Sequence, residues 1–132
     1  MFKKRFPKLS SSAGGDACGT RPNCVCSVCQ QETSHFVEPL TGLGPKPIDR
    51  LVETVKSMDR ARLITTEDHY LHVEFRSALI GFVDDVEFLV DGDIAHVRSA
   101  SRVGYGDHGV NRKRVEEIRN RLQLTNSKGE RA

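Results

Sequence analysis

The sequence contains no tryptophan, and aromatic residues make up only 6% of its 132 residues. Apolar residues reach 37%, which is low for a chain packed throughout, so we expect part of it to lie outside the core. A single domain is expected, because two domains of half this length would each bury too little surface. We find no internal repeat.

Long apolar runs are also missing. No run approaches the roughly 18 residues that span a bilayer, so a transmembrane segment is not expected. The basic start MFKKRF is typical of a secretory signal, but the apolar stretch of about 7–15 residues that should follow it is absent. The sequence therefore favours a cytoplasmic location, with export as the alternative if the true start lies upstream.

The charges are nearly balanced, with 20 basic and 18 acidic side chains giving a net charge of +2. That balance does not favour nucleic acid as a partner. Basic residues do concentrate at the start of the chain and after residue 112. The aromatic residues near them are Phe2, Phe6 and Tyr105, too few for a platform on which bases stack.

Four segments are expected along the chain. Residues 1–17 are basic and then Ser/Gly-rich, which is typical of a disordered arm. Residues 18–46 hold the cysteines and a Pro/Gly-containing linker, which we expect to be irregular and to wrap on the surface. The ordered core is expected at 47–124, followed by a disordered tail at 125–132.

The core pattern predicts a helix, four strands and a second helix. The first helix starts at Pro47 and repeats apolar residues at helical spacing, at Ile48, Leu51, Val52, Val55 and Met58. The strands are expected at 60–66, 70–76, 82–90 and 94–99, and the closing helix carries Val115, Ile118 and Leu122 on one face. Short links between strands favour hairpins. The predicted fold class is therefore α+β, an antiparallel sheet of about four strands with helices packed on one face.

Alternation along these strands places charged side chains on the face opposite Leu71, Val73 and Phe75. They are Glu74, Arg76, Asp85, Glu87, His96 and Arg98. The simplest interpretation is cross-strand ion pairs on a solvated face. The alternative is a hydrolase or lyase site that uses Asp85, Glu87 and His96 for acid–base chemistry.

Asp84 is an exception to the alternation. It falls on the apolar side of its strand, with Val86 and Phe88. Such a position predicts either an edge of the strand or a buried acid paired with an arginine.

Residues 98–112, RSASRVGYGDHGVNR, lead from the last strand into the closing helix. Helix N-termini attract anions, so the two serines with Arg102 and Arg112 form a candidate carboxylate or phosphate cradle. Asn111 should face the sheet, because it lies four positions before Val115. No nucleotide fingerprint is present. The candidate ligand-binding residues are Arg76, Asp85, Arg98, Ser99, Ser101, Arg102, Asp107, Asn111 and Arg112.

The alternative interpretation of the same loop is purely structural. In it Asp107 caps the helix, the glycines make turns, and the arginines pair with Asp85 or Glu87. Polar residues at helix starts usually satisfy backbone groups in this way.

This loop resembles the recurrent pattern RSASRxGxxDxGxNR of a bacterial and plant family catalogued as domain of unknown function family 1499. The resemblance covers roughly residues 18–122. The most family-like positions are Cys18, Asn23, Cys24, Arg76, Asp84, Asp85, Arg98, Ser99, Ser101, Arg102, Gly104, Asp107, Asn111 and Arg112. The family has no established activity, so the resemblance implies no mechanism. Many relatives carry export or lumenal targeting sequences, which differs from the start of this chain.

All four cysteines, Cys18, Cys24, Cys26 and Cys29, lie in one short stretch spaced C-x5-C-x-C-x2-C. Zinc is one candidate cofactor, although only the last pair has the usual ligand spacing and His35 would have to replace a thiolate. An iron–sulfur cluster is another, although the spacing matches neither common ferredoxin run. A disulfide between Cys18 and Cys24, with a redox-active or incidental second pair, and four unliganded thiols are the remaining alternatives.

The resemblance bears on this choice. It implies a special relation between Cys18 and Cys24, since the family has a similar C-x5-C segment with Pro-Asn before the second cysteine. Serine is more usual where Cys26 stands, so a metal site here would not be a family trait. Disulfides are rare in a reducing cytosol.

Three functions follow as hypotheses. The first is a small non-catalytic binding or accessory module that holds an anionic small molecule or an acidic protein segment. It is preferred to an enzyme because the sequence has no nucleophile–base pair in a recognisable local context. The second is a zinc, iron–sulfur or thiol-redox protein centred on the cysteines. The third is the hydrolase or lyase on the charged face.

Overall fold

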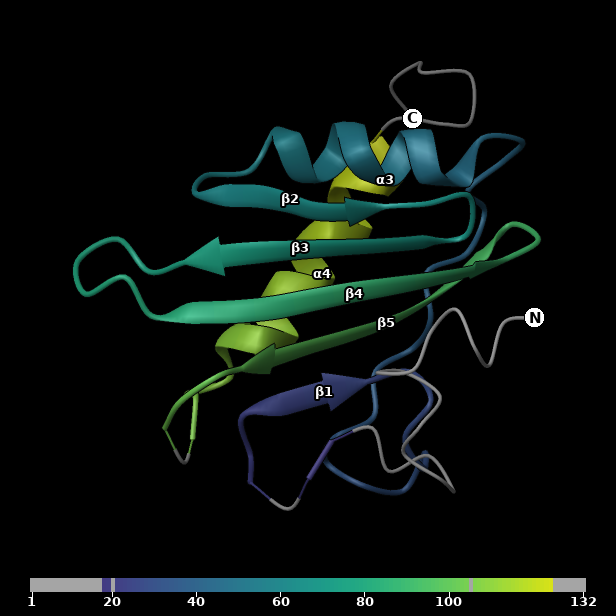
Figure 1. Cartoon of the computed structure of the whole chain (residues 1–132). Helices are drawn as coiled ribbons and strands as arrows, with labels where there is room; N and C mark the ends of the chain where they lie inside the picture. Colours follow the sequence, from purple (N-terminus) through teal and green to yellow (C-terminus); the bar gives the residue numbers. More distant parts are fainter. Residues whose placement is uncertain (1–17, 20, 105, 125–132) are drawn as a thin grey trace.

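The computed structural model describes residues 18–19, 21–104 and 106–124, and the predicted basic arm and C-terminal tail lie outside them. The chain folds into a five-stranded antiparallel sheet in the order β1-β5-β4-β3-β2 with two helices packed on one face (Figure 1). The predicted fold class is confirmed. Within the described residues, no helix is long and apolar enough to cross a membrane.

Helix α3 (Pro47–Lys56) covers β2 and β3. Pro47 fits the first turn, because its missing N–H would have no intrahelical partner there. Leu51 and Val55 lie four positions apart, on the same side of the helix, and both are buried. The helix ends at Lys56, and the N–H of the next residue, Ser57, donates to carbonyls of the last turn.

Four strands follow as consecutive hairpins: β2 (Ala61–Thr66), β3 (Tyr70–Arg76), β4 (Val83–Asp91) and β5 (Ile94–Ser101). Their predicted bounds agree with the structure to within one or two residues. Gly92 opens the β4–β5 turn at φ +67°, a left-handed conformation that favours glycine.

The fifth strand, β1 (Cys24–Cys26), was not predicted. It pairs antiparallel with β5 and places Cys24 opposite Ala100. Three residues are too short for alternation to reveal a strand, so pairing with β5 defines it. The linker after it was predicted to wrap the surface. That prediction is wrong for Val37, Leu40 and Leu43, which are buried in the main core.

Helix α4 (Val110–Leu124) crosses behind the sheet and contacts β5 and β1 (Figure 1). Val115, Ile118 and Leu122 are buried, as predicted. They pack on the apolar face of the sheet, to which Leu71 and Val73 contribute. The end of the sheet where α4 begins is also where β5 ends and β4 starts.

Candidate functional site

Alternation along β5 divides the candidate residues between two faces. Ser99 and Ser101 point to the helix face, on which α4 packs, and bond to Asn111. Arg98 and Arg102 point to the opposite face, here called the outer face, and bond to carboxylates of neighbouring strands. The structure therefore does not bring all the predicted cradle residues together.

On the outer face, Glu87 is fully buried at 0% exposure. Tyr70 donates its hydroxyl to Oε2 at 2.5 Å, and Arg98 Nη1 donates to Oε1 at 3.2 Å. Burial, followed by the bond to Glu87, raises the pKa of Tyr70. The phenol therefore stays a donor at physiological pH, and both carboxylate oxygens have a partner.

A second outer-face network surrounds Asp85. His72 Nε2 lies 2.7 Å from Oδ1, and Arg102 donates its Nε to Oδ2 at 2.7 Å and its Nη2 to Oδ1 at 2.9 Å. The same Nη2 donates to Glu74 Oε2 at 2.5 Å. Burial alone would raise the pKa of Asp85, but the bonds from Arg102 and His72 outweigh it and lower the pKa to about 2.

These contacts bear on the hydrolase or lyase hypothesis. Glu87 is inaccessible, and Asp85 is occupied by Arg102. His96 Nδ1 lies 3.1 Å from the hydroxyl of Ser27, and burial lowers the pKa of His96. Each group is bonded to a different partner, so the structure does not assemble the three into an acid–base site. The ion pairs predicted for this face exist, but its centre is buried rather than solvated.

On the helix face, Asn111 is buried against the sheet, as predicted. Both its side-chain oxygen and its side-chain nitrogen form hydrogen bonds. Its Oδ1 accepts from Ser99 Oγ at 2.6 Å. Its Nδ2 donates to Ser101 Oγ at 2.9 Å and to the Asn23 carbonyl at 3.1 Å. We call Ser99, Ser101 and Asn111 the latch, because they fasten the start of α4 to β5 and to the chain before β1.

Asp107 caps the helix. Its carboxylate accepts from the N–H of Gly109 at 2.8 Å and from the N–H of Asn111 at 3.1 Å. Burial would raise the pKa of Asp107, but these bonds and one from the Asn111 side chain lower it. The structural interpretation of this residue is confirmed.

Asp84 is the buried acid with an arginine partner. Its Oδ2 lies 2.8 Å from Nη1 of Arg114, whose guanidinium also stacks 4.8 Å from the centre of the Phe75 ring. Arg114 was not among the candidates. The signal for it was the misplaced Asp84, together with an arginine one turn after Asn111.

Arg102 and Arg112 have different partners. Arg112 Nη2 donates to the carbonyl of Ser34, in the segment after β1, at 2.5 Å. Arg76 lies at the end of β3, where Nη2 is 3.8 Å from Glu74 and Nη1 is 3.5 Å from the Gly81 carbonyl.

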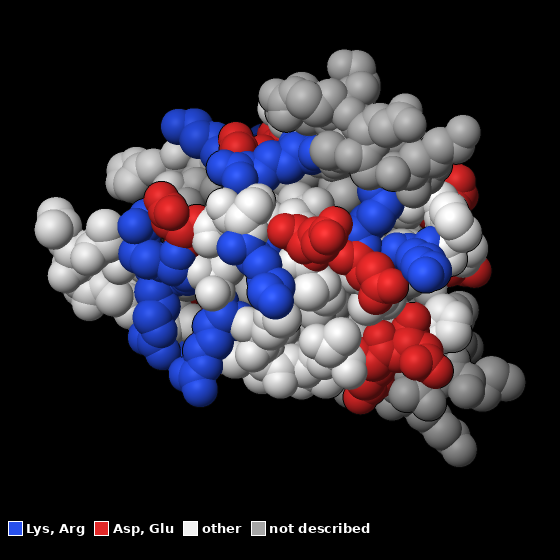
Figure 2. All heavy atoms as spheres, turned by 90° about the horizontal axis from the view of Figure 1, so that it is seen from above, with Lys and Arg blue, Asp and Glu red and all other residues white. Residues whose placement is uncertain are grey.

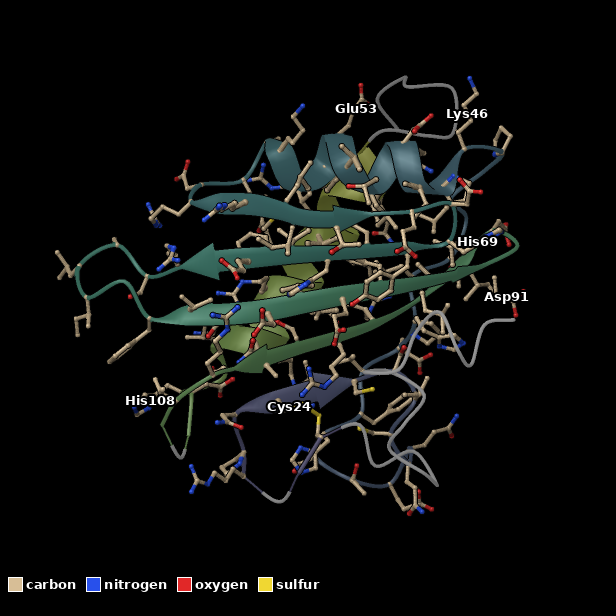
Figure 3. All side chains as sticks on the ribbon, in the orientation of Figure 1. Cys24, Lys46, Glu53, His69, Asp91 and His108 are labelled. Carbon is tan, nitrogen blue, oxygen red and sulfur yellow. A yellow bond between two sulfur atoms is a disulfide. The ribbon has the colours of Figure 1, made fainter. Side chains whose placement is uncertain are left out.

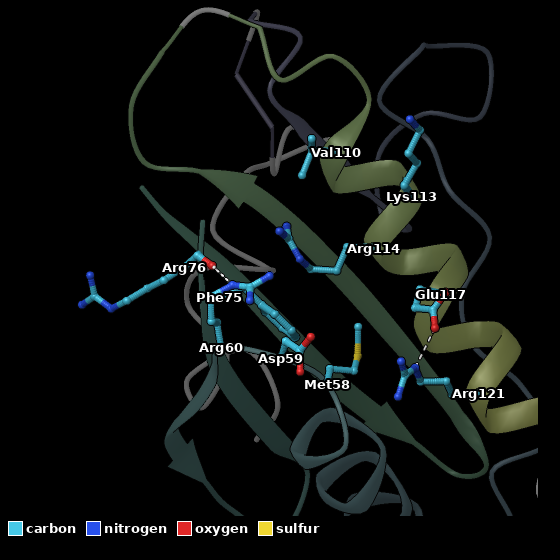
Figure 4. A pocket seen from close by; sticks show the side chains of 10 residues that line it. All are labelled: Met58, Asp59, Arg60, Phe75, Arg76, Val110, Lys113, Arg114, Glu117 and Arg121. Carbon is cyan, nitrogen blue, oxygen red and sulfur yellow. Dashed lines mark hydrogen bonds and ion pairs between the residues drawn. The ribbon is translucent and has the colours of Figure 1, made fainter. Parts of the chain in front are cut away.

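A pocket of about 850 Å³ opens beside the latch, at the end of the sheet where α4 begins. Its lining comes from the residue before β2, from β3, the β3–β4 loop, β4, β5 and the loop after it, and from α4: Arg60, Arg76, Ser77, Phe82, Val83, Asp84, Ser101, Val103, Gly104, Gly106, Asp107, His108, Val110 and Arg114. A neighbouring hollow of about 350 Å³ shares Arg60, Arg76, Val110 and Arg114 (Figure 4). The candidates Arg76, Ser101 and Asp107 reach this pocket, whereas Asp85 and Arg98 do not.

Arg60 differs from the other cations of the lining. Its Nε donates to the backbone carbonyl of Arg76 at 3.1 Å, as the dashed line in Figure 4 shows, and it has no acidic partner among the described residues. Arg114 is paired with Asp84. The pocket therefore contains a guanidinium whose charge is not neutralised within the described chain.

The chain matches the model of the family described as "Protein of unknown function (DUF1499)" over residues 16–122. It belongs to this family. No curated protein and no solved structure matches it.

In this DUF1499 chain, Cys18 and Cys24 form a disulfide, and Figure 3 labels Cys24, the first residue of β1. Cys26 and Cys29 are free and buried. Burial raises the pKa of the Cys26 thiol to about 12, against an opposing bond from the Val28 N–H. A protonated thiol is a poor nucleophile and a poor metal ligand.

The metal hypothesis gains no support from this arrangement. Sulfurs joined in a disulfide are not thiolates, so the four-cysteine set is not assembled in the DUF1499 fold. Among the described residues, no three His, Cys, Asp or Glu side chains come close enough to hold a metal ion.

Proposed function

We propose that this DUF1499 protein is a non-catalytic binding module, and that the pocket beside the latch holds an anionic amphiphile. By this we mean a carboxylate or phosphate joined to an apolar group. The observation that carries the proposal is Arg60, an exposed guanidinium without an acidic partner among the described residues, in a pocket that also has an apolar wall.

The charges of the lining favour an anion. Both carboxylates are already engaged, Asp84 by Arg114 and Asp107 by the N–H groups at the start of α4. The guanidiniums of Arg60 and Arg76 are exposed, and the nearest acidic oxygen to Arg76 is 3.8 Å away. Guanidinium groups match carboxylates and phosphates in shape and can form two parallel hydrogen bonds to them.

The apolar part of the lining favours a ligand with an apolar group. Phe82, Val103 and Val110 line the pocket and are all exposed. Covering them would remove apolar surface from water at about 25 cal/mol per Å². The volume of about 850 Å³ lies in the range of known small-molecule sites.

The hydrogen bonds of the latch hold one part of the pocket lining in place. Ser101 and Asp107 belong both to the lining and to the hydrogen bonds that hold Asn111. Among the described residues, every buried side-chain nitrogen and oxygen has a partner. A wall held in this way keeps its geometry without a ligand, which reduces the ordering cost of binding.

Binding without catalysis is favoured by the hydroxyl groups of the lining. Ser77 Oγ accepts from the N–H groups of Gly81 and Phe82, and Ser101 Oγ accepts from Asn111. Neither hydroxyl has a hydrogen bond to a histidine or carboxylate among the described residues, so neither is activated as a nucleophile.

Calorimetric titration tests the proposal. The probes are decanoate, decyl phosphate, decanol and decyltrimethylammonium, given to the native protein and to Arg60→Gln. We expect the two anions to bind, and Arg60→Gln to weaken them about tenfold, as loss of a charged hydrogen bond implies. Arg62→Gln is the matched control, since Arg62 is exposed on β2 and lines neither hollow.

Three results would overturn it. If decyltrimethylammonium bound as tightly as the two anions, the charge of the ligand would not determine binding. An equal loss in Arg62→Gln would make the effect a general one of net charge. Binding of an acidic peptide with no decanoate binding would assign the pocket to a protein segment instead.

We also infer that the protein works in an oxidising compartment. The Cys18–Cys24 disulfide supports this, because such bonds persist in exported and lumenal proteins and are rare in the cytosol. The compartment expected from the start of the sequence is different, and a count of reactive thiols before and after reduction decides between them.

A further inference from the structure

We propose that the loop between β3 and β4, residues 77–82, docks on the surface of an anionic lipid bilayer. This loop projects beyond the sheet at one end of the molecule (Figure 1). Leu79 is 97% exposed and Ile80 is 71% exposed. Neither residue lines the pocket or the hollow beside it, so the proposed amphiphile does not account for them.

Other exposed apolar side chains lie on neighbouring elements at the same end of the molecule. Phe82, at the base of the loop, lines the pocket mouth together with Val103 and Val110. Five of the seven exposed large apolar side chains among the described residues thus lie at this end of the molecule. Exposed apolar side chains gathered at one end of a folded protein indicate a surface where a partner docks.

Cations surround this apolar surface. Arg60, Arg76 and Arg102 are exposed at the adjoining ends of β2, β3 and β5. The carboxylate that pairs with two of them is recessed: the Glu74 side chain is 12% exposed, against 48% for Arg76 and 46% for Arg102. Figure 2 shows basic side chains gathered beside the projecting end. Arg76 and Arg102 therefore present their guanidinium groups to solvent ahead of the Glu74 carboxylate, although Asp59 beside Arg60 is also exposed.

Acidic residues occupy the other end of the same strands. Asp68 lies in the β2–β3 turn, and Asp91 and Asp93 lie at the β4–β5 turn, all exposed. Figure 3 labels Asp91 at the end opposite the β3–β4 loop. This asymmetry would turn the loop toward a negatively charged surface as the molecule approaches.

An anionic bilayer fits both features together. Leucine and isoleucine at a loop tip can enter the boundary between headgroups and acyl chains, while arginines beside them meet lipid phosphates. A neutral apolar partner would match the tip but not the cations around it, and an acidic soluble protein would match the cations but not the tip.

The absence of tryptophan from the sequence provides a direct test. In Leu79→Trp, a single indole reports the environment of the tip. We expect its emission to shift to the blue, and to be quenched by brominated acyl chains, with vesicles of phosphatidylcholine mixed with phosphatidylglycerol. Added salt should reduce the effect. Ile94→Trp is the control, because Ile94 is exposed at the opposite end of the sheet and its emission should stay unchanged.

Vesicle flotation with substituted proteins completes the test. Leu79→Ser with Ile80→Ser should reduce the bound fraction at least about tenfold through lost apolar contact with the membrane, and Ile94→Ser should not. Decanoate binding in the pocket should be unchanged in the tip variant, which separates the two proposals. Equal binding to pure phosphatidylcholine, or no loss in the tip variant, would overturn the inference. A blue shift of Leu79→Trp that grows with protein concentration without vesicles would also overturn it and make the tip a self-association surface.

Discussion

The side-chain oxygen of Asn111 lies 2.6 Å from the hydroxyl of Ser99, and neither residue is exposed to solvent. This bond joins the first turn of α4 to β5. Ser99 and Asn111, two of the most family-like residues, therefore have a structural role: they hold the start of α4 against the sheet. The pocket opens beside these residues. Ser101 and Asp107 line the pocket and also bond to the Asn111 side chain.

Asn111→Asp should destabilise the fold strongly although it hardly changes shape. The new carboxylate cannot donate to Ser101 or to the Asn23 carbonyl, and it would lie against Asp107, whose Oδ2 is 2.7 Å from the present Nδ2. We expect a loss of about 3 kcal/mol or more in unfolding free energy at neutral pH. Urea unfolding measures it.

The pH dependence of the same variant is the internal control. Burial against Asp107 would raise the pKa of the introduced carboxyl above its ordinary value of about 4, so the deficit relative to the native protein should shrink as pH falls toward about 4, where protonation removes the repulsion and restores a donor. A deficit that does not change with pH would attribute the loss to packing and contradict the latch as described.

Arg98→Met should leave Glu87 as a buried carboxylate with Tyr70 as its remaining described hydrogen-bond donor. Removing one member of a buried ion pair costs about 3–5 kcal/mol, so the variant should unfold at much lower urea. Adding Glu87→Gln to Arg98→Met should recover a good part of the loss, because the unpaired charge disappears. Equal stability of the single and double variants would contradict the importance of this pair.

Acid should weaken the fold through Asp85. Its pKa is lowered to about 2 in the folded state, from an ordinary value of 3.8. Its contribution to stability is therefore complete above about pH 4 and is lost as pH falls toward about 2. We expect this carboxyl to supply on the order of 1–2 kcal/mol at neutral pH. Unfolding curves between these pH values should be less pH-dependent in Asp85→Asn, and an unchanged slope would contradict the assignment.

Thiol counting by alkylation and mass spectrometry should find two reactive cysteines in the unfolded, unreduced protein and four after reduction. The two are Cys26 and Cys29, since Cys18 and Cys24 are joined. In the folded protein Cys26 should react slowly, because its pKa of about 12 keeps the thiol protonated. Four reactive thiols before reduction, in protein taken directly from its own cells, would place it in a reducing compartment.

Most of the correct sequence-based predictions came from the alternation of apolar and charged residues along the strands. It placed Glu74, Asp85 and Arg98 on one face and Asn111 against the sheet. For Asp84 it left two alternatives, an edge of the strand or a buried acid paired with an arginine, and the structure shows the second. These inferences depend only on the period of a strand or a helix, which the sequence displays directly.

What the sequence did not predict depends on contacts between distant segments. Strand β1 exists through its pairing with β5, about 75 positions away along the chain. The separation of Arg102 from Arg112 depends on the path of the intervening loop, which turns at Gly104 and Gly109 with φ of +90° and +80°. Residue types show that such turns are allowed but not where the chain goes afterwards.

Titrating isotope-labelled protein with decanoate and following its backbone amide resonances shows whether the pocket beside the latch holds an anionic amphiphile. We predict saturable shifts confined to the lining, at Ser77, Val103, Gly104 and Val110, and their loss in Arg60→Gln. Shifts spread over exposed lysines and arginines in general, or a saturable set of shifts away from this pocket, would contradict the account.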